Sequence, residues 1–474
     1  MHFRREEIDS FHATDYEVDP RTGEILLRYA LSGRSGGGVG AASTVIGFEE
    51  RIDLGGPIEL EDRQRQAFER IVRLLHAVAG TSYYKAAAPG VVSIDSGPLG
   101  SDEQRFVSDL YDKGLREFAH RNGLPVPHSV ELRLESAQSS DVVDSGDSLE
   151  ERLHGRPSPG IAVPIGGGKD SLVVVEALRD LRPVLVAVNP APAPRRCSEA
   201  AGLDLVGLSR TLDPALLELN ASGALNGHVP ITAIVSLITV LAGYVHGYSA
   251  TVMALENSAD EPTRRVGSVE VNHQWSKSSE CERELRAALA SISPGVRCGS
   301  VMRDLSELEI AGCFAELTRF HSAFRSCNRA FSITNPLDGW CNDCPKCRFV
   351  YLTLATSLDP GQLTRIFGED LLQRRDQVDG FRDLLEEDRK PFECVGTRSE
   401  SIEAFARLAR SDRWSEALVV SKLRPLVESI RAGSVGTEGS LLRRGPAEVL
   451  RLIRERAESI AGGLLEPATP SRPE

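Results

Sequence analysis

Hydrophobic positions in the first part of the chain recur at strand spacing and then at helix spacing. Residues 16–30 read as two strands on either side of a Pro-Arg-Thr-Gly turn, and residues 43–54 predict a third strand. Between residues 68 and 78, apolar residues recur three and four positions apart, which is the spacing of a helix with one buried face. We therefore expect an α+β domain over residues 1–136.

A second helix of this domain is expected to begin at Ser101. Gln104 stands three residues later, the spacing of a capping box in which two side chains satisfy free amides of the first turn. The helical pattern continues to about Gly123. The segment 137–158 is rich in Ser, Asp and Gly without apolar periodicity, so it predicts a flexible linker.

Beyond the linker, short apolar runs alternate with helical segments. The pattern predicts strands at 161–165, 184–188, 251–255 and 295–301, and helices at 171–181, at 230–244 and from Ser279. Such alternation is typical of βαβ units around a parallel sheet. The predicted fold class is α/β. We expect a nucleotide-binding domain with flanking helices over residues 159–360 and a mainly helical C-terminal region over residues 361–474.

The segment 230–244 is strongly apolar but shorter than the ~20 residues that a membrane-spanning helix needs. Thr and Ser interrupt it, so we expect a buried helix and no membrane association. Met1–Arg5 is charged and no apolar signal segment follows it. The nine cysteines are an odd count without such a signal, which indicates reduced thiols and a cytoplasmic protein.

Composition narrows the function classes further. The chain is 41% hydrophobic and 26% charged, a globular balance that excludes a collagen-like or wholly disordered protein. The formal net charge of −13 weighs against a nucleic-acid partner, although a local basic groove is compatible with it. The sequence does not reveal the oligomeric state.

The sharpest chemical signal is a glycine run between a predicted strand and a predicted helix. The run consists of Gly166, Gly167, Gly168, Lys169, Asp170 and Ser171. Glycines let backbone amides approach an anion, and a helix N-terminus adds donors and a favourable dipole. The spacing is neither that of a Walker A loop nor that of a Rossmann motif. We expect a phosphate-binding loop; the alternative is a glycine turn without a ligand.

This run resembles the SGGxDS loop of the PP-loop ATP pyrophosphatases, which split ATP into AMP and pyrophosphate while they adenylate a substrate. The resemblance implies a PP-loop fold for the central domain. It also implies that Gly167, Gly168 and Ser171 hold pyrophosphate, with Gly166 standing where the pattern has its first serine. Asp170 would serve Mg²⁺, and Lys169 would neutralise the phosphates.

A cysteine cluster is the second signal. Cys341, Cys344 and Cys347 form a C-x2-C-x2-C pattern, and Cys327 stands fourteen positions upstream as a fourth candidate ligand. Four thiolates at short spacing suit a structural, tetrahedral Zn²⁺ ion. An iron–sulfur cluster is an alternative, and unmetallated thiols that shape a substrate loop are another. Some PP-loop enzymes carry a similar zinc-binding quartet.

Several separated motifs together resemble one family. They are Thr81–Pro89, Asn226–Pro230, Glu256–Ala259, Val271–Ser278, Ser326–Arg329, Trp340–Phe349 and Lys390–Gly396. With the glycine run, this set looks like the UDP-N-acetylmuramoyl-L-alanyl-L-glutamate epimerase family of peptidoglycan synthesis. The resemblance spans roughly residues 10 to 400; the tail from about 401 lies outside it.

The resemblance implies an ATP- and Mg²⁺-dependent isomerase whose substrate is UDP-MurNAc-L-Ala-L-Glu. Removing a proton beside a carboxylate is very slow, because the anion places a second negative charge next to the first. A mixed anhydride with AMP removes the first charge. We therefore expect adenylation, enolisation, reprotonation on the opposite face, and hydrolysis to free acid, AMP and pyrophosphate.

This reaction needs proton-transfer groups and donors for the enolate. The candidates for catalysis are His273, Lys277, Glu256, His228 and Lys85. The candidates for substrate binding are Tyr84, Asn257, Asn272, Arg329 and Arg348. We favour His273 and Lys277 for proton transfer. For His228, Glu256 and Tyr84 the alternatives are a helix cap, a structural ion pair and a core aromatic, respectively. The sequence is compatible with a one-base mechanism and with a two-base mechanism.

Lysine usage supports these motifs independently. Only seven of the 55 basic residues are lysines, and five of them, residues 85, 169, 277, 346 and 390, fall inside the motifs. A lysine can lose its proton when buried, whereas an arginine effectively cannot.

Two other functions remain open from the sequence. One is another PP-loop reaction, such as tRNA thiolation or nitrile formation on a deazaguanine. The other is a regulator that binds ATP without chemistry.

Overall fold

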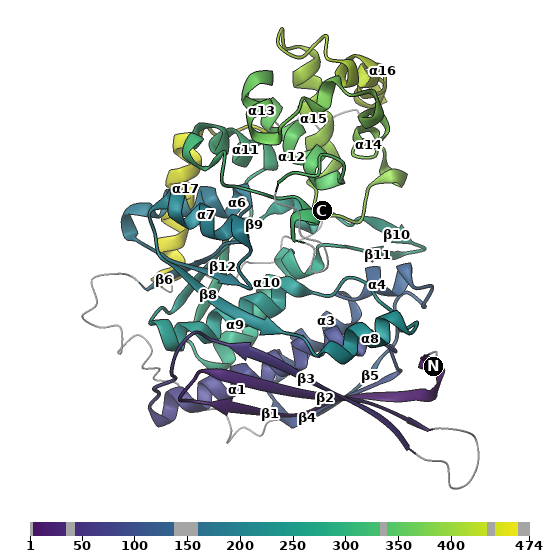
Figure 1. Ribbon diagram of the computed structural model, residues 1–474, viewed down its shortest axis with the longest axis vertical. Helices are drawn as coiled ribbons and strands as arrows, with labels where there is room; N and C mark the ends of the chain where they lie inside the picture. Colours follow the sequence, from purple (N-terminus) through teal and green to yellow (C-terminus); the bar gives the residue numbers. More distant parts are fainter. Residues whose placement is uncertain (1–2, 35–42, 137–159, 332–338, 434–440, 463–474) are drawn as a thin grey trace.

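The computed structural model describes residues 3–34, 43–136, 160–331, 339–433 and 441–462 (Figure 1). The predicted linker at 137–158 lies outside these described residues. A large sheet occupies the lower and middle parts of the molecule, and a group of helices lies above it in Figure 1. The predicted α/β fold class and helical C-terminal region are therefore confirmed.

Within the described residues, ten strands form the large sheet and two form a separate hairpin. The ten are β1 (Ile8–Asp19), β2 (Glu24–Arg34), β3 (Ser43–Asp53), β4 (Val91–Leu99), β5 (Glu131–Ser136), β6 (Ile161–Pro164), β7 (Val184–Val188), β8 (Leu205–Thr211), β9 (Ala250–Glu256) and β12 (Arg297–Met302). The hairpin consists of β10 (Arg264–Val266) and β11 (Val269–Val271).

The helices before the cysteine cluster are α1 (Asp62–Ala79), α2 (Thr81–Tyr84), α3 (Ser101–Asp112), α4 (Arg116–Arg121), α6 (Lys169–Ala177), α7 (Pro192–Ala201), α8 (Pro214–Ala221), α9 (Ile231–His246), α10 (Ser279–Ile292) and α11 (Glu307–Glu316). From the cluster onward they are α12 (Pro345–Ala355), α13 (Pro360–Phe367), α14 (Val378–Arg382), α15 (Arg398–Ala409), α16 (Leu418–Gly433) and α17 (Pro446–Ala461). Short 3-10 turns connect several of them.

One half of the large sheet consists of parallel strands only, and its strand order reverses direction. Its neighbours run β12-β9-β6-β7-β8, and every pair is parallel. Along the chain, β6, β7 and β8 extend the sheet in one direction, and β9 and β12 then extend it in the other. In open α/β sheets a ligand binds beyond the carboxyl ends of the strands at such a reversal. In this protein the reversal lies between β6 and β9.

The N-terminal strands continue the same sheet. β3, β2 and β1 pair antiparallel, and β4 and β5 follow in parallel. β3 joins the parallel half through β8, with Ile52 opposite Arg210. Strand pairing therefore crosses from the predicted α+β domain to the predicted nucleotide-binding domain.

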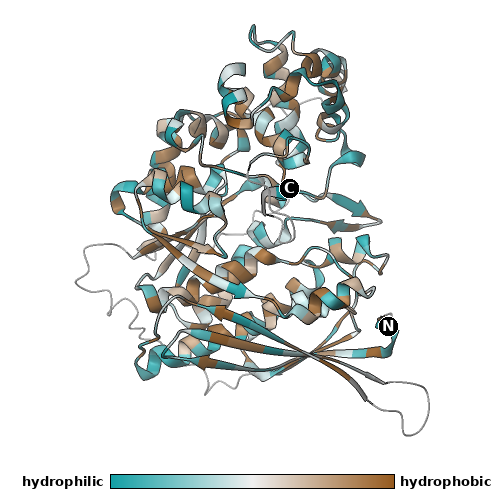
Figure 2. Ribbon diagram, in the orientation of Figure 1, coloured by the Kyte–Doolittle hydropathy of each residue, from teal (hydrophilic) through white to brown (hydrophobic). Residues whose placement is uncertain are grey.

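The long apolar segment is a buried helix, as expected. Eleven residues of α9 are buried, among them Leu237, Leu241 and Tyr244. Its C-terminus ends at Gly247, which adopts a left-handed conformation. Within the described part of the chain, no helix combines the length and apolarity of a membrane span. In Figure 2 hydrophobic positions concentrate along α9 and alternate with hydrophilic ones along the N-terminal strands.

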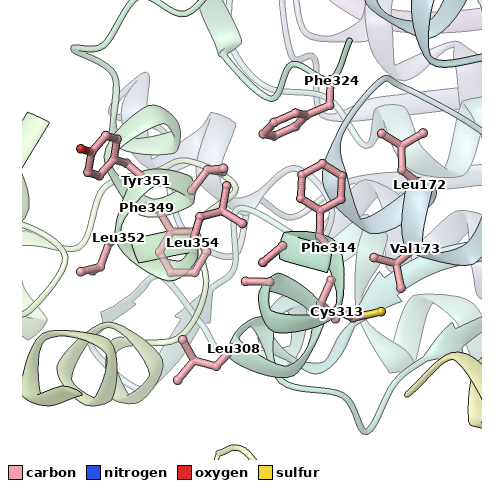
Figure 3. Close-up of a cluster of buried hydrophobic side chains, with 14 of the residues drawn as sticks. Leu172, Val173, Leu308, Cys313, Phe314, Phe324, Phe349, Tyr351, Leu352 and Leu354 are labelled. Atoms are coloured by element: carbon pink, nitrogen blue, oxygen red, sulfur yellow. The ribbon is translucent and has the colours of Figure 1, made fainter. Parts of the chain in front are cut away.

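A hydrophobic core packs against α6, the helix that follows the glycine run. Leu172 and Val173 of α6 pack in one cluster with Leu308 and Phe314 of α11 and with side chains of α12 (Figure 3). α17 returns from the end of the described chain to contact α6, α11 and β12 (Figure 1, yellow). Val449, Ile453 and Ala457 supply its fully buried face. α6 is therefore packed by both α11 and α17.

The predicted helix from Ser101 to Gly123 is wrong in two details. Gly100, not Ser101, is the extended residue before α3, so the Ser101 side chain cannot form a capping box; Gln104 Nε2 instead donates to the Leu99 carbonyl at 2.8 Å. The helix also breaks between α3 and α4, where Gly114 packs against Trp275. The break turns α4 toward the site described below.

A buried ion pair crosses the β3–β8 junction and gives a stability prediction. Arg210 Nε and Nη2 donate to the two carboxylate oxygens of Glu50 at 2.7 and 3.0 Å, and the Glu50 side chain is 0% exposed. Glu50→Ala leaves the guanidinium buried without its anion. We expect a loss of about 3–5 kcal/mol in unfolding free energy, measured by urea denaturation.

The matched control is Glu455→Ala, which removes the acid of an exposed helical pair with Arg451. Such a pair contributes at most about 1 kcal/mol. Equal losses for the two variants would contradict a special role for the junction.

Candidate active site

The glycine loop, residues 166–168, connects the carboxyl end of β6 to α6. Gly167 has a φ of +85°, and a Cβ there would lie 2.9 Å from the Cβ of Ala193 in α7, so both conformation and space require glycine. Gly168 precedes α6, and no side chain caps that N-terminus. Ser171 Oγ donates to the Gly168 carbonyl at 3.2 Å. A helix N-terminus without a side-chain cap, next to a glycine turn, suits an anion.

A buried ion cluster lies at the start of α6. Lys169 Nζ contacts the carboxylates of both Asp170 and Glu307, and the Lys169 and Glu307 side chains are each 1% exposed. Burial favours the neutral form of Asp170, but Lys169 and Lys346 together lower its pKa below the usual value. Burial raises the pKa of Glu307 to about 8 despite Lys169. Asp170 is therefore the ionised acid of the cluster, and its side chain is 25% exposed.

Glu256 lies beside this cluster, as predicted for the carboxyl edge of the sheet. It is the last residue of β9, the neighbour of β6 at the reversal of strand order. Its carboxylate is buried and accepts a hydrogen bond from Ser258 Oγ at 2.7 Å. Its charge acts on both Lys277 and Glu307. Glu256 therefore lies between the glycine loop and the next group of side chains.

Two histidines and a glutamate lie together near the segment that follows β11. His273 Nδ1 lies 2.6 Å from Glu117 Oε2, which comes from α4 in the N-terminal half. The rings of His228 and His273 have centroids 4.4 Å apart. Glu117 is buried, whereas both histidines are partly exposed. The N-terminal half thus contributes directly to the site.

Cys394 completes this group from the segment between α14 and α15. Lys277 Nζ donates to Cys394 Sγ at 3.2 Å. His273 is also close enough to Cys394 for the two groups to shift each other's pKa. Because Glu117 occupies Nδ1 of His273, Nε2 is the nitrogen left for the sulfur. We call Glu117, His228, His273, Lys277 and Cys394 the imidazole–thiol cluster.

Neighbouring contacts hold this cluster in place. Arg303, directly after β12, donates from Nη1 to the Lys277 carbonyl at 2.6 Å. Gln274 Nε2 donates to the Val395 carbonyl at 3.2 Å. A Cβ on Gly396 would lie 2.3 Å from the Phe349 ring, so only glycine lets this segment pack so closely on α12.

The two histidines of the cluster differ in protonation state. Burial lowers the pKa of His228 to about 4, and the neighbouring His273 adds to this shift. Burial alone would also lower the pKa of His273, but hydrogen bonds to Cys394 and Glu117 raise it to about 9. At neutral pH His228 is a neutral imidazole and His273 an imidazolium. Pairs shifted apart in this way are typical of acid–base sites.

Cys394 is a thiolate in this environment. Burial would raise its pKa, but the Lys277 charge, the His273 hydrogen bond and the Lys346 charge lower it to about 6. Burial would lower the pKa of Lys277, but Cys394 and Glu256 hold it well above its usual range. Lys277 is therefore a fixed cation and a donor, not a resting base.

Two further lysines of the predicted motifs lie near the cluster. Lys85 Nζ donates to Asn226 Oδ1 at 2.7 Å, and burial together with Arg210 lowers its pKa to about 8. Its charge acts on His228. The charge of Lys346 acts on both Asp170 and Cys394.

The four predicted metal-binding cysteines come together. Their sulfurs lie within 4.8 Å of one another, with Cys341 and Cys344 at 3.8 and 3.5 Å from Cys347. Backbone amides of the C-x2-C-x2-C segment donate to three of the sulfurs at 3.3–3.4 Å. We call this group the cysteine quartet.

The structure places the remaining predicted residues away from the cluster's contacts. Tyr84 is fully buried against the Phe11 and Tyr111 rings, the core position considered as its alternative. Asn257 is exposed. Asn272 donates to the Ala259 carbonyl at 2.7 Å and accepts from the Gln274 amide at 2.8 Å.

The two predicted arginines lie beside the quartet. Arg329 and Arg348 both contact Asp343, at 3.2 and 2.8 Å. Arg348 also donates to Gln377 Oε1 at 2.8 Å. Arg348 therefore links α12 to the segment before α14.

Four residues of the site were not predicted: Glu117, Arg303, Glu307 and Cys394. Cys394 stands inside the Lys390–Gly396 motif, so a search for isolated thiols within motifs could have found it. Glu117 and Glu307 sit on helices with ordinary composition, and Arg303 is one of many arginines. Nothing in their sequence context distinguishes these three.

The family models and the relatives that match this chain agree with one another. The family model described as the MurL N-terminal domain matches residues 2–295, and the MurL C-terminal domain matches residues 323–436. The second match extends beyond residue 401, so the expectation that the tail lies outside the resemblance is wrong.

Three relatives are named UDP-N-acetyl-alpha-D-muramoyl-L-alanyl-L-glutamate epimerase. The protein from Micromonospora is 40% identical and covers 93% of this chain and 96% of its own. The protein from Salinispora tropica is 39% identical with 97% coverage of both. The protein from Xanthomonas oryzae pv. oryzae is 37% identical and covers 92% and 96%.

The pKa of Cys394 gives a pH prediction. A thiol with a lowered pKa is a thiolate above that value, so its alkylation by iodoacetamide should reach half its maximal rate near pH 6. Peptide mass spectrometry at Cys394 measures this rate. Cys313, whose pKa burial raises to about 12, serves as the internal reference and should stay unmodified across this range. A midpoint near the ordinary value of about 8.5 would contradict the assigned environment.

Proposed function

The chain belongs to the UDP-N-acetyl-alpha-D-muramoyl-L-alanyl-L-glutamate epimerase family, and from this we propose that it inverts the terminal L-Glu of UDP-MurNAc-L-Ala-L-Glu to D-Glu at the expense of ATP. Its product is a peptidoglycan precursor. The observation that carries the proposal is the meeting of the glycine loop and the imidazole–thiol cluster at the strand-order reversal. One part suits nucleotide phosphates, and the other suits proton transfer.

Activation of the carboxylate explains why both parts are needed. Loss of the α-proton beside a free carboxylate would concentrate two negative charges on neighbouring atoms. Transfer of AMP to the carboxylate removes the first charge and makes the α-proton far more acidic. The proposed sequence is adenylation, enolisation, reprotonation on the opposite face and hydrolysis, with AMP and pyrophosphate as co-products.

The glycine loop supports adenylation in the manner of the PP-loop enzymes. Gly167, Gly168 and Ser171 would hold the pyrophosphate portion of ATP, with the amides of α6 as donors. Asp170 is ionised and partly exposed, so it fits a Mg²⁺ ion, which would neutralise phosphate charge. Lys346, which is partly exposed, would add a further positive charge.

The imidazole–thiol cluster supports proton exchange. The neutral His228 can accept a proton, and the protonated His273 can donate one. Lys277 is a fixed cation that would stabilise the enolate oxygen. This revises the sequence-based preference for Lys277 as a base, while His273 keeps a role in proton transfer. The nine free cysteines fit the reducing cytoplasm, the location expected from the sequence.

The cysteine quartet supports a structural zinc ion. Four Zn–S bonds of about 2.3 Å in a tetrahedron separate the sulfurs by about 3.8 Å, close to the two separations given above. Amide donors to sulfur stabilise thiolate ligands. Such an ion would tie the segment at Cys327 to the N-terminus of α12.

Purified protein with ATP, Mg²⁺ and UDP-MurNAc-L-Ala-L-Glu should convert the terminal residue to D-Glu, with AMP and pyrophosphate released. Chiral chromatography of the hydrolysed product measures the conversion. Asp170→Ala should abolish AMP formation, because its carboxylate would hold Mg²⁺ at the phosphates. His273→Ala should retain some AMP release and lose epimerisation.

Asp180→Ala, which changes an exposed aspartate paired with Arg454, is the matched control and should keep both activities. In deuterated water the D-Glu product should carry deuterium at Cα. Inversion without ATP, or a product without deuterium, would refute the proposed sequence.

Metal analysis of purified protein should find about one zinc ion per chain, because the quartet offers a single four-sulfur site. Cys344→Ser should lose most of the zinc, whereas Cys313→Ser, outside the quartet, should retain it. Stoichiometric iron, or wild-type protein without metal, would contradict the zinc assignment.

A further inference from the structure

Resting on the proposed function, we propose that Cys394 takes the glutamyl group from AMP as a thioester, and that the α-proton exchanges on this thioester. Glu117, His273 and Cys394 form the carboxylate, imidazole and thiol of a nucleophilic triad. The adenylate is then the activated donor, and the chain itself carries the masked carboxyl group during inversion.

The contacts fit the requirements of an activated nucleophile. Such a site needs a nucleophile within reach of a base that a third group orients. Glu117 fixes Nδ1 of His273 at 2.6 Å, and His273 is close enough to Cys394 to lower the pKa of its thiol. Lys277 Nζ, 3.2 Å from the sulfur, adds a second positive charge. A thiolate paired with an imidazolium is the reactive form of such a cysteine.

Accessibility separates Cys394 from the other cysteines outside the quartet. Cys197, Cys281, Cys298 and Cys313 are all buried, whereas Cys394 is partly exposed. Burial raises the pKa of each of these four. Cys394 alone among these five combines partial exposure of the residue with a charge environment that favours the thiolate.

Cys394 shares its positively charged neighbours with the glycine loop. Lys277 and Lys346 act on both Asp170 and the thiolate, so the same two positive charges serve both groups. An acyl group activated at the loop would therefore be formed within a shared positive field. This field would also attract the anionic adenylate toward the sulfur.

The chemistry balances without an added reagent. The thiolate attacks the carbonyl carbon of the glutamyl adenylate, a C–S bond forms, and the C–O bond to AMP breaks. AMP leaves with the electron pair as its phosphate anion and needs no proton. After inversion, water adds to the thioester and loses its proton to imidazole, and the C–S bond breaks to return the thiolate and the free acid.

Acylation would also change the acidity of the neighbouring histidine. Forming the thioester removes the negative charge of the sulfur, which is one of the groups that hold the proton on His273. The imidazolium then becomes a stronger acid when the enolate needs a proton. The neutral imidazole left behind can accept the proton of the hydrolytic water.

The direct test is acid quenching of the wild-type enzyme during turnover with ATP, Mg²⁺ and UDP-MurNAc-L-Ala-L-Glu, followed by intact-protein and peptide mass spectrometry. A substrate-dependent adduct on Cys394 that hydroxylamine releases is expected. ATP–pyrophosphate exchange measured in the same samples reports adenylation independently. Wild-type protein without exchange would refute the proposed function, whereas exchange and inversion without any adduct would refute only the thioester.

The variants Cys394→Ala and Cys394→Ser separate a nucleophile from an unrelated structural role. Both should lose inversion by more than about 100-fold and keep pyrophosphate exchange within about threefold. Cys313→Ala, a buried cysteine of α11, is the control and should keep both. Inversion above a tenth of the wild-type rate in either Cys394 variant would overturn the proposal, as would lost inversion combined with an adduct-free wild type.

Discussion

Compensation of buried charge holds the site together. Lys169 can lie at 1% exposure only because Asp170 and Glu307 neutralise it, and an isolated buried ammonium would otherwise lose its proton. Lys277 is stabilised in the same way by the Cys394 thiolate and Glu256. Removing any one charge shifts the protonation of the others, so the loop and the imidazole–thiol cluster act as one electrostatic unit.

The sheet topology explains why these charges meet. β6 and β9 are separated by some ninety residues of chain but are neighbours at the reversal, which brings the glycine loop and Glu256 together. The β3–β8 pairing extends the same sheet into the N-terminal half. The chain breaks its helix before α4, and Glu117 of α4 lies beside His273. The N-terminal half therefore supplies a side chain of the imidazole–thiol cluster.

Sequence patterns predicted the elements better than their contacts. The glycine run, the carboxyl-edge position of Glu256 and the cysteine quartet each carry local signals, because glycine conformation, strand direction and ligand spacing are short-range properties. Tyr84 and Arg348 looked like substrate contacts because they stand in polar motifs, but packing against Phe11 and pairing with Asp343 decide their environments. Glu117 and Cys394 become partners of His273 only through tertiary contacts, and no pattern along the chain encodes that proximity.

The position of α17 has a consequence for biosynthesis. Its buried face, with Val449 and Ile453, closes the core behind α6, yet the ribosome makes this helix long after the glycine loop has emerged. During translation, α6 therefore lacks this packing. The core around α6 becomes complete only after the last described helix has been made.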